Sequence, residues 1–232
     1  VNIAQPFKSS GMMLTCRKDM GVNSTDDLKG KTLGVWFYGN EYPFLSWMSR
    51  LGLATDGSAN GVTVLKQGWG VEPLTEGQAA CVSTMSYNEY WVVRDAGYTP
   101  EQLTVFKYQA QGASTLEDGL YVLEKNLGDD SFKDKMVRFV RASMKGWKYA
   151  EANPKEAASI ILDNDDAGVQ TEKHQIRMMG EIAKLTAGSN GSLDPSDYER
   201  TVKVLMSGAS DPVITKEPSG AWTHDITNAA LN

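Results

Sequence analysis

Flat rings and hydrogen-bonding groups crowd one short stretch of this chain, from residue 36 to residue 42. The stretch contains Trp36, Tyr38, Gly39, Asn40, Glu41 and Tyr42. Aromatic side chains stack on flat ligands, while amide and carboxylate groups bind a ligand's polar edge. A carboxylate at a helix start also takes the place that a bound anion would occupy. These residues favour a site for a small, flat, polar molecule rather than for a phosphate. The alternative is a chance cluster of aromatics beside an amphipathic helix.

A second cluster, Tyr87, Asn88 and Glu89, follows a later apolar segment that is predicted as a strand. Ligands of open α/β sheets bind outside the carboxyl ends of strands, so both clusters are expected on one rim. Glu41 and Glu89 would then face one cleft. Two carboxylates there can do acid–base work or accept hydrogen bonds from an amine or amidine. The alternative for Glu89 is an early helix residue that the helix dipole favours.

The residue types needed for catalysis or metal binding are not brought together by the sequence. His174 and His224 fall far from both clusters, and the sequence has no Walker, Rossmann or Gly-x-Ser-x-Gly motif. Cys16 and Cys81 lack metal-ligand spacing. Two buried free thiols are expected, and a disulfide is the alternative, which would need an oxidising compartment. The sequence therefore predicts no enzyme activity, no catalytic residue, no metal and no cofactor.

Charge and composition narrow the range of partners. The chain has 232 residues, with 23 basic and 29 acidic side chains and a formal net charge of −6. Because no basic block stands out, nucleic acid is not expected as a partner. No run of about 18 apolar residues predicts a membrane span. Val1 is not a natural start, so we expect the chain to begin downstream of a signal peptide.

Hydrophobic periodicity predicts the elements that carry the two clusters. Gly39 permits a tight turn after a strand, Asn40 is a good N-cap, and Pro43 suits the first turn of the following helix. Strand and helix alternate along the first half of the chain, which favours a mainly parallel sheet with covering helices. Strands are predicted at residues 1–5, 12–17, 32–38, 62–66, 79–85, 103–108 and 120–123. The longer helices are predicted after residue 40, from residue 130 to the break at 153, and at 154–162, 171–185, 195–206 and 225–231.

An ordered series of motifs resembles one protein family. The motifs are Asp27-Leu-Lys-Gly-Lys-Thr-Leu-Gly-Val-Trp36, Gly39-Asn-Glu-Tyr-Pro-Phe-Leu45, Gln67-Gly-Trp-Gly-Val-Glu-Pro-Leu74, Tyr87-Asn-Glu-Tyr90 and Glu117-Asp-Gly-Leu-Tyr-Val122. They resemble the solute-binding proteins of ABC importers of the nitrate/sulfonate/taurine class. The branch most like this chain includes the thiamine-pyrimidine-precursor binders and their fungal pyrimidine-synthase relatives. The resemblance runs from Val1 to about Ala157.

This resemblance implies a type II periplasmic-binding-protein fold, in which a two-segment hinge joins two α/β lobes that close on a ligand. Lobe two would span residues 18–118, and lobe one residues 1–17 and 119–232. The implied partners are a small-molecule ligand and the membrane permease of an ABC transporter. The implied location is periplasmic or lipid-anchored extracytoplasmic. The implied ligand contacts are Phe7, Ser9, Ser10, Gly11, Trp36, Tyr38, Gly39, Asn40, Glu41, Tyr42, Tyr87, Asn88 and Glu89.

The chain departs from the family pattern in two places. At the helix start, the pattern of sulfonate binders resembles Gly-Thr-Ser, whereas this chain has Asn40 and Glu41. That difference favours a heterocyclic ligand, such as a pyrimidine thiamine precursor or a flavin-like compound. The alternatives are an alkyl sulfonate or nitrate-type anion, a pyrimidine-synthase-like enzyme, or a non-binding interaction protein. At about 30 residues per βαβ unit, roughly the first quarter of a family member is expected before Val1. Lobe one would then be incomplete, and its sheet is expected either to have an exposed edge or to borrow a strand from another copy by self-association.

Overall fold

The computed structural model describes residues 1–207 and 212–231. The chain forms two compact units. The first consists of Val1–Ser10, Leu116–Glu199 and Glu217–Asn232, and the second of Gly11–Thr115 and Arg200–Lys216. The predicted boundary after residue 17 differs from the observed one because residues 12–17 form a strand of the second unit's sheet. Residues 208–211, between the helices predicted at 195–206 and 225–231, lie outside the described residues.

The second unit is built on a five-stranded sheet in the order β4-β3-β5-β2-β6. The strands are β2 (Met12–Arg17), β3 (Thr32–Val35), β4 (Thr63–Lys66), β5 (Cys81–Met85) and β6 (Leu103–Lys107). β3 runs parallel to β4 and β5, whereas β2 runs antiparallel to β5 and β6. Four of these five strands therefore point the same way, as strand–helix alternation predicts. β2 is reversed because 3₁₀ turns at Lys18–Met20 and Thr25–Leu28, and no crossover helix, connect it to β3.

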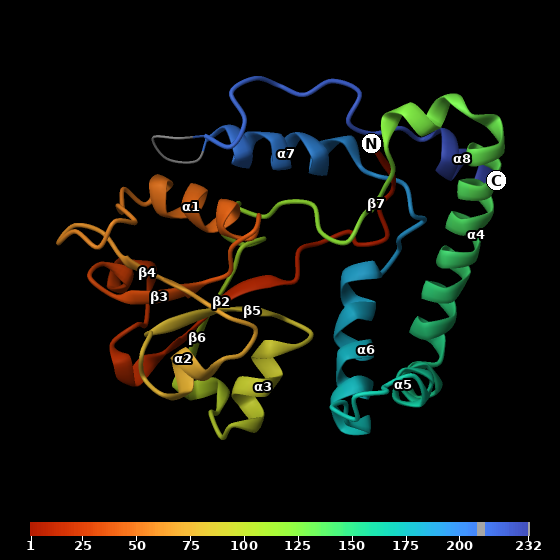
Figure 1. Ribbon diagram of the computed structural model, residues 1–232. Coiled ribbons are helices and arrows are strands. Elements are labelled where there is room, and N and C mark those ends of the chain that lie inside the picture. The colour runs from red at the N-terminus through yellow and green to blue at the C-terminus, as the bar shows by residue number, and fades with distance from the viewer. Residues whose placement is uncertain (208–211, 232) are drawn as a thin grey trace. The chain divides into compact units, whose positions relative to one another are not determined.

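Helices cover both faces of this sheet. α1 (Glu41–Arg50) packs on one face, where Phe44 and Trp47 join the core cluster that contains Leu33 of β3. α2 (Glu72–Thr75) and α3 (Glu89–Asp95) belong to a second cluster, in which Leu74 and Val93 meet strand side chains of the other face. Figure 1 shows α1 on one side of the sheet and α2 and α3 on the other. Because both faces are covered, the site must lie at an edge, where the strands end.

Cys16 of β2 and Cys81 of β5 form a disulfide, so the expectation of two free thiols was wrong. The two residues are directly opposite each other, with Cα atoms 3.9 Å apart. The backbone hydrogen bond from Arg17 N to Ala80 O makes them a non-hydrogen-bonded pair, the type in which facing antiparallel residues lie closest. The bridge thus follows from the register of two strands that are 65 residues apart in sequence.

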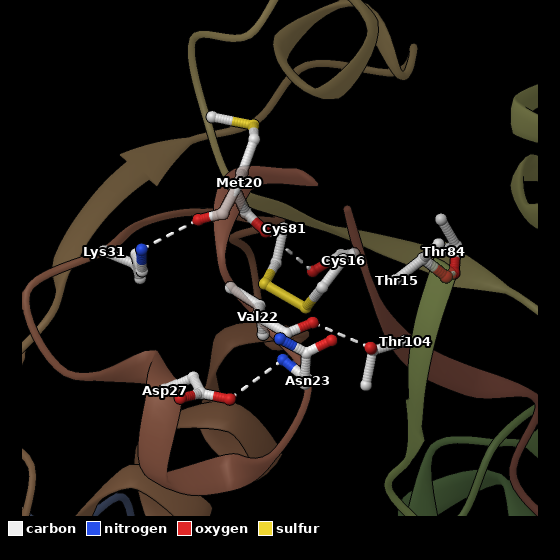
Figure 2. Close-up of a disulfide and its surroundings, with 12 residues drawn as sticks. Thr15, Cys16, Met20, Val22, Asn23, Asp27, Lys31, Cys81, Thr84 and Thr104 are labelled. Carbon is white, nitrogen blue, oxygen red and sulfur yellow. Dashed lines mark hydrogen bonds between the residues drawn. A yellow bond between two sulfur atoms is a disulfide. The ribbon is translucent and has the colours of Figure 1, made fainter. Parts of the chain in front are cut away.

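The segment that connects β2 to β3 lies around this disulfide (Figure 2). Thr104 Oγ1 donates to Val22 O at 2.7 Å, and both cysteine side chains are fully buried. In the same segment, the backbone N–H groups of Asn23 and Ser24 donate to the Asp27 carboxylate and hold the pKa of that group below its usual range. The bridge is therefore shielded from solvent in the folded protein.

The first unit is mainly helical. Its helices are α4 (Asp130–Ala152), α5 (Pro154–Asp163), α6 (Glu172–Thr186) and α8 (Asp225–Leu231), and α7 (Pro195–Met206) leads from this unit into the second. The strands β1 (Asn2–Ala4) and β7 (Leu120–Tyr121) pair antiparallel. Ile3, Val140 and Ile226 share one core cluster. Asp129 caps α4 by accepting from Ser131 N at 2.8 Å. Short 3₁₀ turns occupy Pro100–Gln102 and Glu124–Gly128.

Candidate ligand-binding site

The chain leaves β3 through a turn whose backbone is left-handed. Tyr38 has a φ angle of 66° and Gly39 one of 109°. The left-handed region costs a residue with a side chain about 1–2 kcal/mol, so Tyr38 is held in a strained conformation. The Glu41 carboxylate stabilises the turn by accepting from Gly39 N at 2.7 Å. Asn40 makes no side-chain capping bond, so its predicted capping role was wrong; its own backbone is already helical, with φ −75° and ψ −18°.

The second predicted rim follows β5 and begins α3. Glu89 accepts from Met85 N at 2.8 Å and from Asn88 Nδ2 at 2.7 Å. Gly11, at the start of β2, reaches the same edge of the sheet, because Ser86 N donates to Gly11 O at 2.8 Å. Glu89, like Glu41, is thus bound by groups at the start of its own helix. This arrangement agrees with the alternative given above for Glu89, an early helix residue that the helix dipole favours.

Gln67, directly after β4, builds the floor between the strand ends. Its side-chain amide accepts from Ser83 N at 2.8 Å and donates to Ser83 O at 3.0 Å and Gly70 O at 3.1 Å. The buried amide therefore pairs with β5 as a strand backbone would, at the point where β3 turns out of the sheet. Gly34 leaves room for it, since a Cβ there would lie 3.2 Å from Gln67 Oε1 and 2.9 Å from Val82 Cγ1.

A hollow of about 460 Å³ opens above this floor, at the ends of β3, β4 and β5. All of its lining residues belong to the second unit. They are Trp36, Phe37, Tyr38, Asn40, Lys66, Gln67, Gly68, Trp69, Met85 and Glu89. Four of these side chains are aromatic, and the others include two amides, one ammonium and one carboxylate. The hollow therefore offers flat apolar walls with a few polar groups, which is the usual make-up of a small-molecule site.

Two of the aromatic walls are almost completely exposed. The side chain of Trp69 is 97% exposed and that of Tyr38 is 92% exposed. Trp36 is oriented by its indole Nε1, which donates to Gly68 O at 2.9 Å. Lys66 Nζ lies 4.8 Å from the centroid of the Tyr38 ring and donates to its hydroxyl at 3.4 Å. Large exposed rings that gather at one hollow are more informative than single exposed apolar residues, and they indicate a binding surface.

The structure brings some of the predicted contacts to the hollow and places others elsewhere. Trp36, Tyr38, Asn40 and Glu89 line it. The remaining predicted contacts in the second unit lie nearby along the chain without lining it: Gly11, Gly39, Glu41, Tyr42, Tyr87 and Asn88. Phe7, Ser9 and Ser10 belong to the first unit, where Ser10 Oγ donates to Glu117 and the Phe7 ring meets Trp147 edge-on. These three stay predictions.

Sequence reasoning missed the part of the hollow that β4 supplies. Lys66, Gln67 and Trp69 all line it, as do Phe37, Gly68 and Met85. The strand predicted at 62–66 ends at this glutamine–glycine–tryptophan stretch. Because β3, β4 and β5 are parallel, their carboxyl ends meet at one edge. The same strand-end argument that selected the other two clusters therefore points to this one as well.

The remaining chemistry-bearing residues serve local structure. His224 Nε2 lies 2.8 Å from Leu193 O, with its ring against Trp222. His174 occupies the first turn of α6, where its backbone N–H donates to Thr171 Oγ1. Among residues 1–207 and 212–231, no group of three or more His, Cys, Asp or Glu side chains could hold a metal ion. Over the same residues, none of the helices has the length and apolar character of a membrane span.

These features define an α/β protein with an aromatic-lined hollow at the carboxyl edge of a sheet. The model of the NMT1/THI5-like family matches residues 1–157, more than half of the chain. The chain therefore belongs to the NMT1/THI5-like family, and the resemblance drawn from its motifs is confirmed over the range it was given. A comparison with curated proteins gave no match.

Solved structures align with this chain at low sequence identity. A protein from Bordetella bronchiseptica RB50 aligns at 18% identity with a TM-score of 0.67, over 99% of this chain and 73% of that one. A putative periplasmic sulfonate-binding protein of an ABC transporter from Methylobacillus flagellatus KT aligns at 13% identity with a TM-score of 0.48, over 96% and 71%. A periplasmic binding protein from Brucella ovis with glutathione bound aligns at 13% identity with a TM-score of 0.36, over 87% and 61%. The first likeness confirms the α/β fold, and the other two are too weak to say anything of function.

Proposed function

We propose that this protein is the solute-binding component of an ABC importer and that it binds a small heteroaromatic nutrient. The observation that carries this proposal is the hollow of about 460 Å³ walled by four aromatic side chains. Its volume falls within the range of about 300–1,000 Å³ that is usual for small-molecule sites. Membership of the NMT1/THI5-like family supports the same role. The two compact units would be the two lobes of such a protein.

The hollow is suited to binding rather than to a reaction. Trp36 and Trp69 offer faces on which a ring can stack. Asn40 Nδ2 donates to Phe37 O at 3.4 Å, so the amide offers its second N–H and its Oδ1 to a polar edge. Gln67 is already engaged by Ser83 and Gly70, so it shapes the floor and leaves recognition to the walls. A pyrimidine of the thiamine-precursor type, or a ring system of similar size, matches these groups. No enzymatic step is proposed.

The disulfide supports an extracytoplasmic location. Disulfides persist in oxidising compartments and are rare in reducing ones. The Cys16–Cys81 bridge lies in the core of the unit that carries the hollow. The partner proposed for this protein is accordingly the membrane permease of an importer, which would receive the ligand outside the cytoplasm.

Titration calorimetry with matched variants tests the proposal. The panel contains a hydroxymethylpyrimidine thiamine precursor, riboflavin and taurine as the alkyl sulfonate. Trp69→Ala removes an exposed wall of the hollow, whereas Phe139→Ala removes a 52% exposed ring from α4 in the other unit. Stacking contributes about 0.5–1.5 kcal/mol beyond buried area, so we expect W69A to weaken heterocycle binding about tenfold and F139A to leave it unchanged. Heat with taurine and with no heterocycle would refute the ligand class.

A further inference from the structure

Lys66 is the cationic group of the hollow, and its position is set by the sheet. It is the last residue of β4 and pairs in register with Val35, the last residue of β3. Its ammonium lies 5.5 Å from the Phe37 ring centroid and 4.8 Å from that of Tyr38. A cation within about 6 Å of a ring face is attracted to it. Lys66 therefore holds its charge against the aromatic wall of the hollow.

The charge of Lys66 is not neutralised by a carboxylate. Within residues 1–207 and 212–231, its ammonium contacts the Tyr38 hydroxyl and the rings of Phe37 and Tyr38 and forms no ion pair. Glu89 is the other charged residue that lines the hollow. Both of its carboxylate oxygens accept hydrogen bonds, from Met85 N and Asn88 Nδ2, at a helix start. The hollow therefore presents an available cation and an engaged anion.

The strained turn after β3 places an aromatic ring beside this cation. Tyr38 adopts φ 66° and keeps its side chain 92% exposed, so the ring adds nothing to the protein core. Strained residues of this kind collect at binding sites, where the surrounding structure over-determines them. Glu41, which at first argued against an anionic ligand, is bound to Gly39 N and does not line the hollow. Its carboxylate therefore does not oppose an anion there.

We propose that the ligand carries an acidic group on its ring and that Lys66 is the residue that binds this group. The acidic group is a carboxylate, sulfonate or phosphate, and it accepts from the Lys66 ammonium while the ring stacks on the tryptophan walls. A charge-assisted hydrogen bond of this type is stronger and more selective than one between neutral groups. This inference rests on the proposed function, because it names the ligand class of the same hollow.

Matched acid and amide probes test the role of Lys66. Nicotinate and nicotinamide, and benzoate and benzamide, share a ring and differ only in the acidic group. Calorimetry on the wild type is expected to give at least tenfold tighter binding of each acid, with a dissociation constant that rises with NaCl. K66M is expected to bring the acid-to-amide ratio to about one, and K66R to restore most of it. K107M is the control, because Lys107 is an exposed last residue of another strand of the same sheet and does not line the hollow.

The outcomes separate this inference from the proposed function. If acids and amides bind the wild type equally, or if K66M keeps the preference for acids, the role given to Lys66 is wrong while a heteroaromatic binder stands. The role given to Lys66 is also wrong, and the heteroaromatic binder also stands, if a neutral pyrimidine or flavin binds and no acid does. If none of the aromatic rings binds the wild type, the proposed function fails and this inference fails with it.

Discussion

Replacing Cys16 and Cys81 together by alanine removes the covalent link between β2 and β5. The bridge closes a loop with a sequence separation of 65 residues. The chain-entropy relation for a loop of this size gives a loss of about 4 kcal/mol in the free energy of unfolding. Since domains are stable by only about 5–15 kcal/mol, this is a large share of the total. With a urea slope of about 2 kcal/mol/M, the unfolding midpoint should fall by about 2 M.

Tryptophan fluorescence during urea unfolding follows this change in the second unit, which contains the disulfide. Trp47 is buried in the same core cluster as the disulfide, edge-on to Tyr108. The wild type and C16A/C81A are each measured with and without a phosphine reductant. We expect the reductant to lower the midpoint of the wild type to that of the variant and to leave the variant unchanged. Reduction should be slow without urea, because residues 18–31 shield the bridge.

Two results would refute this reasoning. Thiol counting on the wild type, unfolded without reductant, should find no free thiol; two free thiols would show that the bridge does not form. A midpoint for C16A/C81A within about 0.5 M of the wild type, equivalent to about 1 kcal/mol, would show that the loop entropy does not govern stability here.

Three further predictions concern the framework around the hollow and the bridge. Q67L leaves the Ser83 backbone groups without partners and should lower the free energy of unfolding by about 2–4 kcal/mol, whereas Q78L, at an exposed glutamine, should be neutral in urea unfolding. G34A should lower the free energy of unfolding by about 1–3 kcal/mol, because its Cβ would lie 2.9 Å from Val82 Cγ1. In the same measurement, G146A, in open space on α4, should raise the free energy of unfolding by up to about 1 kcal/mol. Backbone N–H donors lower the pKa of Asp27 in the folded protein. The ionised carboxylate therefore stabilises the fold above the unfolded pKa of about 3.9, and this stabilisation is lost as the pH falls through the folded pKa. D27N should therefore be less stable than the wild type at pH 7, with a difference that shrinks below about pH 4 in melts recorded across pH.

Each of these predictions has its own failing outcome. Equal stability of Q67L and Q78L would mean that the glutamine amide does not hold β5. A stable G34A would mean that β3 and β5 are further apart than described. A difference between D27N and the wild type that stays constant from pH 7 to pH 3 would mean that the carboxylate is not bound by the backbone N–H groups.

Local signals in the sequence predict most of the elements correctly. The helix at Pro195–Met206 matches its prediction to the residue, and a helix at Asp225–Leu231 lies where a last short helix was predicted. Pro43 lies in the first turn of α1, as predicted from the position that proline prefers in a helix. Prediction succeeds here because every determinant lies within one or two turns of chain.

Features that depend on register or on distant neighbours could not be predicted in this way. The Cys16–Cys81 bridge requires knowing that β2 inserts between β5 and β6, which no local pattern specifies. The role proposed for Lys66 depends on the same kind of information, since its ammonium meets rings from the turn that follows β3. Four of the predicted contacts line the hollow because they follow strands whose carboxyl ends meet, whereas Glu41 binds the backbone N–H of Gly39 and does not line it.

Chemical-shift mapping of the indole N–H groups tests the central claim that an aromatic ligand binds in this hollow. The protein is titrated with a ring compound that gives heat in calorimetry, and the six tryptophan side-chain signals are followed. The account predicts that Trp36 and Trp69, which line the hollow, shift together and saturably, while Trp222 in the other unit stays fixed. Saturable shifts that leave Trp36 and Trp69 in place would contradict it.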